Sequence, residues 1–463
     1  MSRLSVAMFM AAAAAQAATV DQVIVRQQWP WREAIRVEYV LSDVSAPVNV
    51  SVEATADGTP VDAAKLAASL SGDVYGVSRN GACALEIDPA VALGASRPSV
   101  RRFQVRLATS PAAANLTQEL YRIFDLDDGS CESLSRADIM NRPDRYGTYE
   151  TDFSRIGPGF NTTLDPDEVF IWTGVTNNPV YKTDKLVMRC INAKDKVWQA
   201  GGDTKYWVKL TNDYFIAVFE TTQAQWTKIY GTNYSHFADA EDAAWRPVEG
   251  VAPGEVIGGV VEWMNIRGTG NASYRTYVGN DAFFNFPNNT YLHDVANKTF
   301  MLKMWLKTEY EFFLPTRAQW EFACRAGTTT DFNSGKATTE ANANEVGWTS
   351  SNASSTRQVG LKPCNAFGLY DMHGNVMEIT PSGGEVNADQ PERGLSADDP
   401  VIEPLGVATD NTIKMGGAFA GELGGWSTTT SWSFKRWFGY SATNSNYMGF
   451  RLVCPVGRQW EAH

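Results

Sequence analysis

The stretch LYDMHGNVMEI, residues 369–379, gathers groups that could do chemistry around a single glycine. Its polar side chains are those of Asp371, His373, Asn375 and Glu378. A catalytic centre, a metal-binding loop and a hydrogen-bonded turn are all compatible with this cluster. Glycine accepts unusual backbone angles, so a turn at Gly374 could aim carbonyl oxygens inward. Calcium binds such mixtures of carboxylate and carbonyl oxygens.

The other histidines and cysteines give little support to a further catalytic or metal site. The four histidines, His236, His293, His373 and His463, have no partner at metal-binding spacing. The six cysteines are Cys83, Cys131, Cys190, Cys324, Cys364 and Cys454. They form no C-x-x-C, and the chain has no G-x-S-x-G elbow. Their even number allows disulfides in an exported chain, but the pairing is not determined by sequence.

The N-terminus predicts export. Arg3 precedes the mostly apolar run of residues 4–15, and Ala15-Gln16-Ala17 fits an A-x-A cleavage site. We therefore expect residues 1–17 to be a signal peptide and the mature protein to be secreted, periplasmic or cell-surface. The apolar run is too short for a membrane span, so no transmembrane segment is expected. A net charge of −12 argues against nucleic acid as a partner.

Residues 18–110 read as an all-β sandwich that precedes the rest of the chain. Apolar residues alternate with others in 35–41, 48–52 and 101–109, as in half-buried strands. Turn formers such as Asp57-Gly58 separate these runs. Residues 111–183 are mixed and rich in turn formers, which predicts an irregular connector.

From residue 184 the pattern changes to short strands with two capped helices. Thr222 with Gln225, and Thr316 with Gln319, fit capping boxes at the helix starts. Gly327 is a plausible stop for the second helix. The inward face of that helix would carry Trp320, Ala323 and Cys324. This mixture indicates an α+β domain over residues 184–457.

Residues 184–457 resemble the formylglycine-generating enzyme family, also called the sulfatase-modifying factor family. The matching blocks, in the family's order, are FIAVFETTQAQW, RPVEGV, LPTRAQWEFACRAGT, NAFGLYDMHGNVMEI, KMGGAF and MGFRLV. The resemblance implies an elaborated C-type-lectin-like fold, an α+β domain with little regular secondary structure.

The same resemblance shows where the family's catalytic copper site would lie in this chain. The sequence of this chain differs from the family's pattern there. Catalytic members bind copper through two cysteines between a GGS-type motif and the GFR motif. Here that interval, residues 416–449, contains no cysteine, while Cys364 and Cys454 only bracket it. Cu(I) needs soft thiolate or thioether ligands, which Ser, Thr and Trp do not supply. We therefore expect no copper and a non-catalytic protein, with a formylglycine-generating oxidase as the alternative. A family branch that makes sulfur-containing histidine derivatives needs an H-x-x-x-H-x-E motif, which is also absent.

The cysteine-free interval has the composition of a binding surface. Aromatic residues supply contact area at low entropy cost, and short polar residues supply adaptable hydrogen bonds. The predicted contact residues are Trp426, Trp432, Phe434, Arg436, Trp437, Phe438, Tyr440, Asn444, Asn446 and Tyr447. The expected partner is a protein or glycan ligand on a cell surface. Alternatively, most of these aromatics fill the domain's core.

A sharper hypothesis follows from the resemblance. Some proteins with this fold are the variable proteins of diversity-generating retroelements, in which a hypermutated ligand-binding stretch lies close to a C-terminal GFRLV-like strand. MGFRLVCP lies close to the end of this chain. The resemblance thus implies a displayed binding protein with residues 426–447 as its contact region. A purely structural surface protein is a further alternative.

The resemblance also implies a structural calcium at the opening stretch. In the family the corresponding G-N-V-W-E-W loop holds this ion. The implied ligands are Asp371 and Glu378 through side chains, and Gly374 and Val376 through backbone oxygens. Met377 and Ile379 replace the family's tryptophans, and a turn without metal is the alternative. His373 is expected to face solvent, because calcium does not favour imidazole. Glu220 and Glu321 are expected to be structural or capping groups.

Overall fold

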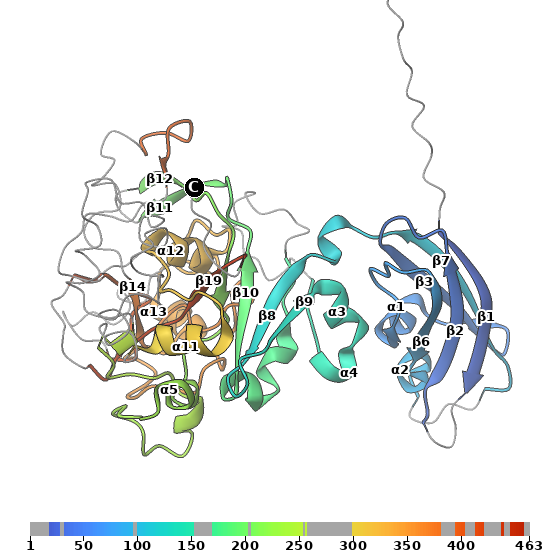
Figure 1. The fold of residues 1–463 in the computed structure, drawn as a ribbon, viewed down its shortest axis with the longest axis horizontal. Coiled ribbons are helices and arrows are strands. Elements are labelled where there is room, and N and C mark those ends of the chain that lie inside the picture. The colour runs from blue at the N-terminus through green and yellow to red at the C-terminus, as the bar shows by residue number, and fades with distance from the viewer. Residues whose placement is uncertain are drawn as a thin grey trace, which may run out of the picture. The chain divides into compact units, whose positions relative to one another are not determined.

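The computed structural model describes most of the chain as two compact units (Figure 1). The described residues are 18–27, 32–95, 100–151, 169–201, 205–252, 255–256, 299–380, 394–402, 413–420, 437–438 and 445–457. The predicted signal peptide, residues 1–17, lies outside them. Within these ranges no helix is long and apolar enough to cross a membrane.

The N-terminal unit comprises Met1–Gln118 and Ser135–Gly147 and contains two antiparallel sheets. The first has the order β1 (Thr19–Gln27), β2 (Ile35–Ser42), β6 (Gly81–Ile87), β5 (Leu70–Gly72). The second has the order β4 (Thr59–Pro60), β3 (Val48–Ala56), β7 (Phe103–Pro111). The short helices are α1 (Ala63–Ala68), α2 (Pro89–Leu93), η1 (Ala114–Leu116), α3 (Arg136–Asn141) and α4 (Pro143–Tyr146). The sequence had predicted an all-β sandwich, but the unit also contains these short helices.

The alternating pattern of β2 explains how these sheets share a core. Val37, Tyr39 and Leu41 are buried, and the residues between them are half-buried. Successive side chains of a strand point to opposite faces, so one face of β2 lies in the core. Val50 of β3 and Leu85 of β6 belong to the same apolar cluster. The predicted strands in residues 35–41, 48–52 and 101–109 are confirmed as β2, β3 and β7.

The segment 111–183 differs from the predicted irregular connector. It contains β8 (Glu119–Asp125) and β9 (Cys131–Ser135), as well as α3, α4, η4 (Thr173–Thr176) and η5 (Pro179–Lys182). Glu119–Leu134 belongs to the second unit, whereas Ser135–Gly147 belongs to the first. The central residues of β8 are buried in succession, so β8 lacks the alternation that reveals a strand in sequence.

The described residues of the second unit form three sheets with many short strands (Figure 1). The largest has the order β19 (Val453–Pro455), β13 (Tyr214–Ala217), β10 (Lys185–Ile191), β8, β9. The next has the order β11 (Val197–Gly201), β12 (Lys205–Lys209), β15 (Val401–Ile402). The third has the order β17 (Trp437–Phe438), β16 (Ile413–Met415), β14 (Met377–Thr380), β18 (Met448–Gly449). This mixed α+β architecture confirms the predicted fold class.

Two helices of the second unit begin where the sequence predicted their caps. Besides η4 and η5, the helices in its described residues are α5 (Gln223–Tyr230), η6 (Ala243–Trp245), α11 (Phe300–Thr308), α12 (Arg317–Arg325) and α13 (Glu340–Val346). Both predicted capping boxes form, at Thr222 for α5 and at Thr316 for α12. Helix α12 ends at Arg325, and Ala326 takes the left-handed conformation before Gly327. The predicted inward face of α12, Trp320, Ala323 and Cys324, is fully buried.

Candidate functional site

The loop 369–379 is buried along its whole length and is shaped by left-handed backbone. Asp371, Gly374 and Asn375 have φ values of 54°, 75° and 58°. A Cβ at Gly374 would lie 2.1 Å from the carbonyl oxygen of Trp348, so only glycine fits there. The backbone N–H of Asn375 donates to that same Trp348 oxygen at 2.8 Å. The loop is therefore locked against the backbone of Trp348.

Asn375 ties four parts of the second unit together. Its Oδ1 accepts from the Arg357 backbone N–H at 2.9 Å, and its Nδ2 donates to Glu220 at 2.6 Å. Its carbonyl oxygen accepts from the Phe419 backbone N–H at 2.9 Å. With the bond to Trp348, every polar group of Asn375 has a protein partner. The residue acts as a brace.

Glu220 and Glu321 are structural acceptors, as the sequence predicted. Glu220 is fully buried, and its Oε1 accepts from the Val376 backbone N–H at 3.1 Å. Burial raises the pKa of Glu220 well above its ordinary value, and nearby carboxylates add to this effect. Glu321 accepts from the backbone N–H of Gly201 and from Arg325, each at 2.9 Å.

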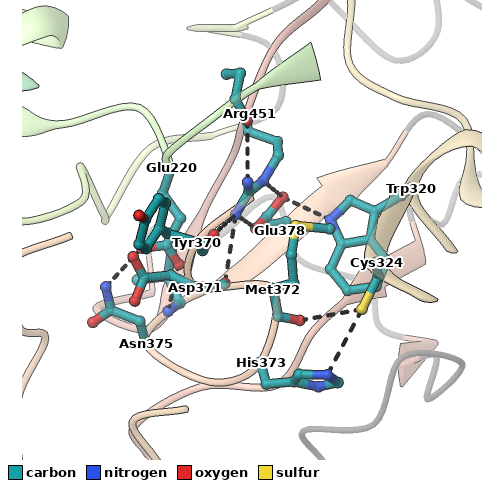
Figure 2. Close-up of polar contacts among 12 residues, drawn as sticks. Glu220, Trp320, Cys324, Tyr370, Asp371, Met372, His373, Asn375, Glu378 and Arg451 are labelled. Atoms are coloured by element: carbon teal, nitrogen blue, oxygen red, sulfur yellow. Dashed lines mark hydrogen bonds and ion pairs between the residues drawn. The ribbon is translucent and has the colours of Figure 1, made fainter. Parts of the chain in front are cut away.

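Glu378 is paired with a residue whose role the sequence did not reveal. Arg451 Nη2 lies 2.6 Å from Glu378 Oε1, and Arg451 Nε lies 2.7 Å from Oε2 (Figure 2). Trp320 Nε1 also donates to Oε2 at 2.7 Å. Arg451 further donates to the carbonyl oxygens of Ala217 and Tyr370. The signal was present: a lone arginine inside the apolar run MGFRLV requires a buried carboxylate partner.

The two carboxylates among the implied calcium ligands, Asp371 and Glu378, do not fit a calcium ion in this arrangement. Both oxygens of Glu378 are held by the Arg451 cation, which would repel a second positive charge. Asp371 Oδ2 accepts from the Gly360 backbone N–H at 2.6 Å, and only its Oδ1 has no partner. Burial raises the pKa of Asp371 to about 6. In the described ranges no group of three or more His, Cys, Asp or Glu side chains could hold a metal ion. Calcium binding through the four implied ligands stays an untested prediction, and the bonds of Glu378 to Arg451 weigh against it.

His373 is fully buried, not solvent-facing as the sequence had suggested. Its Nε2 accepts from the Asn333 backbone N–H at 3.1 Å and lies 3.9 Å from the sulfur of Cys324 (Figure 2). The imidazole also packs edge-on against Phe332. The prediction that His373 faces solvent is wrong because the whole loop 369–379 is buried in the domain. Enclosed in this way, the Cys324–His373 pair is inaccessible to a substrate.

The four buried cysteines do not supply a reactive thiolate. They are Cys83, Cys190, Cys324 and Cys454. Burial raises the pKa of Cys190 and Cys454 to about 12 and that of Cys324 well above its ordinary value. Protonated thiols are poor nucleophiles and poor metal ligands. Cys131 and Cys364 are half-buried.

The predicted contact segment is described only at its flanks and at one strand. Trp426, Trp432, Phe434, Arg436, Tyr440 and Asn444 lie outside the described residues. Trp437 and Phe438 form β17, which pairs antiparallel with β16 through Lys414 and Ile413. Asn446 and Tyr447 are half-buried directly before β18.

Both flanks of the contact segment are held by the buried loop and its neighbours. Phe419, before the segment, donates to the carbonyl oxygen of Asn375. The carbonyl oxygen of Tyr447, at its end, accepts from the Met377 backbone N–H at 2.8 Å. The carbonyl oxygen of Ser445 accepts from the Gly250 backbone N–H at 3.0 Å. Two residues of the loop 369–379, Asn375 and Met377, thus anchor the two flanks of the segment.

These features define a C-type-lectin-like domain of the sulfatase-modifying factor type. Residues 184–456 match the sulfatase-modifying factor enzyme 1-like domain, which is more than half of the chain. The chain belongs to this family.

Individual proteins are similar to parts of the chain. Chaperone protein LppX of Paenibacillus barcinonensis is 28% identical over 185 residues, covering 36% of this chain and 61% of that protein. The chain therefore spans less than two-thirds of that relative's length.

Three solved structures each align with 58% of this chain. Treponema denticola variable protein 1 is 22% identical, with 95% of its chain covered and a TM-score of 0.42. PvdO from Pseudomonas aeruginosa is 17% identical, with 94% covered and a TM-score of 0.38. CarF is 15% identical, with 99% covered and a TM-score of 0.32.

Proposed function

We propose that this chain is an exported, non-catalytic protein that binds a protein or glycan ligand on a cell surface through residues 426–447. The single observation that carries the proposal is the replacement of the family's copper-binding interval by an aromatic, cysteine-free segment. Tryptophan and tyrosine dominate binding energy in protein interfaces because they bury large areas at low entropy cost.

The anchoring of the segment supports this proposal. A binding loop gains affinity when its base is rigid, because less conformational entropy is lost when the ligand binds. The bases here are fixed by backbone hydrogen bonds from Phe419 to Asn375 and from Met377 to Tyr447. Asn375 and Met377 belong to the loop 369–379, which is buried throughout.

The state of the thiols supports a non-catalytic role. An oxidase of this family would need two cysteine sulfurs that can bind copper as thiolates. Cys190, Cys324 and Cys454 are buried with raised pKa values, and residues 416–449 contain no cysteine.

A binding screen with matched variants tests the proposal. The full mature chain would be applied to glycan and peptide arrays, and each hit measured by calorimetry. We expect Trp426→Ala and Trp432→Ala to weaken binding by about tenfold or more. Trp305→Ala on α11, outside the segment, is the control and should leave the affinity unchanged. Equal affinity for all variants would reject the contact segment.

The alternative functions give different results in the same preparation. A formylglycine-generating oxidase would convert a cysteine-containing sulfatase peptide with added copper, as mass spectrometry would detect. We expect no conversion. A structural surface protein would give no soluble ligand and one fixed partner on cross-linking.

We further propose that residues 426–447 are diversified by a retroelement. Their position just before MGFRLVCP supports this hypothesis. The expected genomic observation is a nearby reverse transcriptase gene with a near-copy of the segment whose differences fall at adenines. Absence of both would reject diversification and leave ligand binding unaffected.

A further inference from the structure

Two basic side chains converge on the indole ring of Trp348. Lys362 Nζ lies 4.1 Å from the ring centroid, and Arg357 Cζ lies 5.8 Å from it. All three residues are half-buried, so their side chains remain in partial contact with solvent. Cations over an indole face are modestly stabilised, but the neutral ring supplies no counter-charge.

Two hydrogen-bond donors beside the Trp348 ring lack the acceptors that buried N–H groups normally have. Trp348 Nε1 and Arg357 Nε are buried atoms without a hydrogen-bond partner. Lys362 Nζ donates only to the carbonyl oxygen of Asn344 among its described contacts. Among the described carboxylates, that of buried Asp371 acts on Lys362, but it lies beyond ion-pair distance.

Two other half-buried bases of the second unit are paired with acids. Lys185 lies 2.9 Å from Asp125, and Arg246 lies 2.6 Å from Asp242. Across the described part of the chain, neither Arg357 nor Lys362 lies within ion-pair distance of a carboxylate. In a chain with a net charge of −12, two unpaired bases beside an unpaired indole N–H are a place for an external anion.

Two of the three residues, Trp348 and Arg357, are also held by backbone hydrogen bonds. The Arg357 backbone N–H donates to Asn375 Oδ1, and the Trp348 carbonyl oxygen accepts from the Asn375 backbone N–H. One braced residue therefore fixes the spacing of Trp348 and Arg357. A preorganised pair of donors loses little entropy when an anion binds.

We propose that Trp348, Arg357 and Lys362 form a binding site for the oxyanion group, carboxylate or sulfate, of an acidic ligand. The guanidinium of Arg357 presents parallel N–H donors that match two oxygens of such a group. Lys362 supplies a second positive charge, and the indole N–H supplies a neutral donor. Burial lowers the pKa of Lys362, and a bound anion would oppose that effect. None of the three residues belongs to the contact segment, so the site does not depend on the proposed function.

Equilibrium dialysis of the full mature chain with radiolabelled sulfate tests the site. Chloride would hold the ionic strength constant, because exposed charges are screened by salt. We expect saturable binding to a single class of sites in the wild-type chain. Arg357→Gln and Lys362→Gln should each weaken it by about tenfold, because each removes a charge-assisted hydrogen bond. Trp348→Phe keeps the ring, loses the N–H and should weaken binding by a smaller factor.

The controls separate this site from general attraction and from the contact segment. Lys336→Gln removes an exposed charge that is paired with Glu345 and should leave sulfate binding unchanged. Arg357→Lys keeps the charge and should retain binding better than Arg357→Gln. Trp432→Ala should not alter sulfate binding, whatever its effect on the cell-surface ligand. Competition by acetate would identify a carboxylate as the natural group, and its failure would identify sulfate. Unsaturable binding, or equal binding by wild type and both Gln variants, would overturn the proposal.

Discussion

Arg451 and Glu378 form a fully buried ion pair with two hydrogen bonds between their side chains. Arg451 follows β18, and Glu378 lies in β14 beside it. The pair therefore joins the segment after β18 to the end of the buried loop 369–379. In the same environment Trp320 of α12 donates to Glu378. Helix, loop and C-terminal segment meet at one carboxylate.

Removing one partner of this pair should strongly destabilise the second unit. Glu378→Ala leaves the Arg451 charge buried without a counter-ion, so we expect a loss of about 3–5 kcal/mol in the free energy of unfolding. Urea denaturation followed by far-UV circular dichroism measures it. Glu345→Ala, which breaks an exposed pair with Lys336, should cost no more than about 1 kcal/mol. A similar loss in both variants would contradict the structural role of the pair.

The same pair bears on calcium. Because Arg451 occupies both oxygens of Glu378, we expect added calcium or chelator to leave the melting temperature of the wild-type chain unchanged. Differential scanning calorimetry with calcium, magnesium and EDTA measures this. A calcium-specific rise that disappears in Glu378→Ala would instead establish the ion implied by the family resemblance.

Gly374 should be intolerant of any side chain. Its φ is 75°, and a Cβ would lie 2.1 Å from the Trp348 carbonyl oxygen, which is backbone and cannot swing away. We expect Gly374→Ala to destabilise the unit by several times the cost of Gly231→Ala. At Gly231 the φ is 102° and nothing lies within 4 Å, so only backbone strain of about 1 kcal/mol is expected. Comparable melting temperatures for the two variants would show that the loop can move away from Trp348.

Asn375 should be required for its amide group and not only for its backbone conformation. Asn375→Gly accepts the left-handed φ of 58° but loses the bonds to Glu220 and Arg357, for a cost of about 3 kcal/mol. Asn375→Asp should cost more, because it places a second carboxylate beside Glu220. Asn342, half-buried on α13, is the control position. A milder effect of the Asp variant than of the Gly variant would contradict the assigned hydrogen bonds.

Glu249 should make stability fall as pH rises. Burial raises its pKa above the ordinary value of 4.5, although its oxygens accept from the backbone N–H groups of His236 and Phe237. The folded state thus holds a proton that the unfolded state has already released, and ionisation above pH 4.5 costs folding free energy. This contribution is lost as pH rises from 4.5 through the folded-state pKa. Urea denaturation across that range should show a shallower decline for Glu249→Gln, and an unchanged slope would contradict the assignment.

The sequence by itself determined the features that depend on neighbours along the chain. The capping boxes at Thr222 and Thr316 close within a single helical turn, so residue types three positions apart are enough to predict them. The alternation in β2 likewise reflects the geometry of one strand. The matching motif blocks were sufficient to predict the family and the α+β fold.

Only the tertiary structure decided which distant residues meet. Strand β8 was hidden because its partner β10 lies beyond α3, α4 and residues of the connector. His373 was expected in solvent because nothing near it in sequence shows that Phe332 and Asn333 enclose it. The counter-ion of Glu378 is Arg451, 73 positions away, and the sequence alone made calcium the expected partner. Burial and charge pairing are set by packing between remote segments, and packing is what a local pattern does not contain.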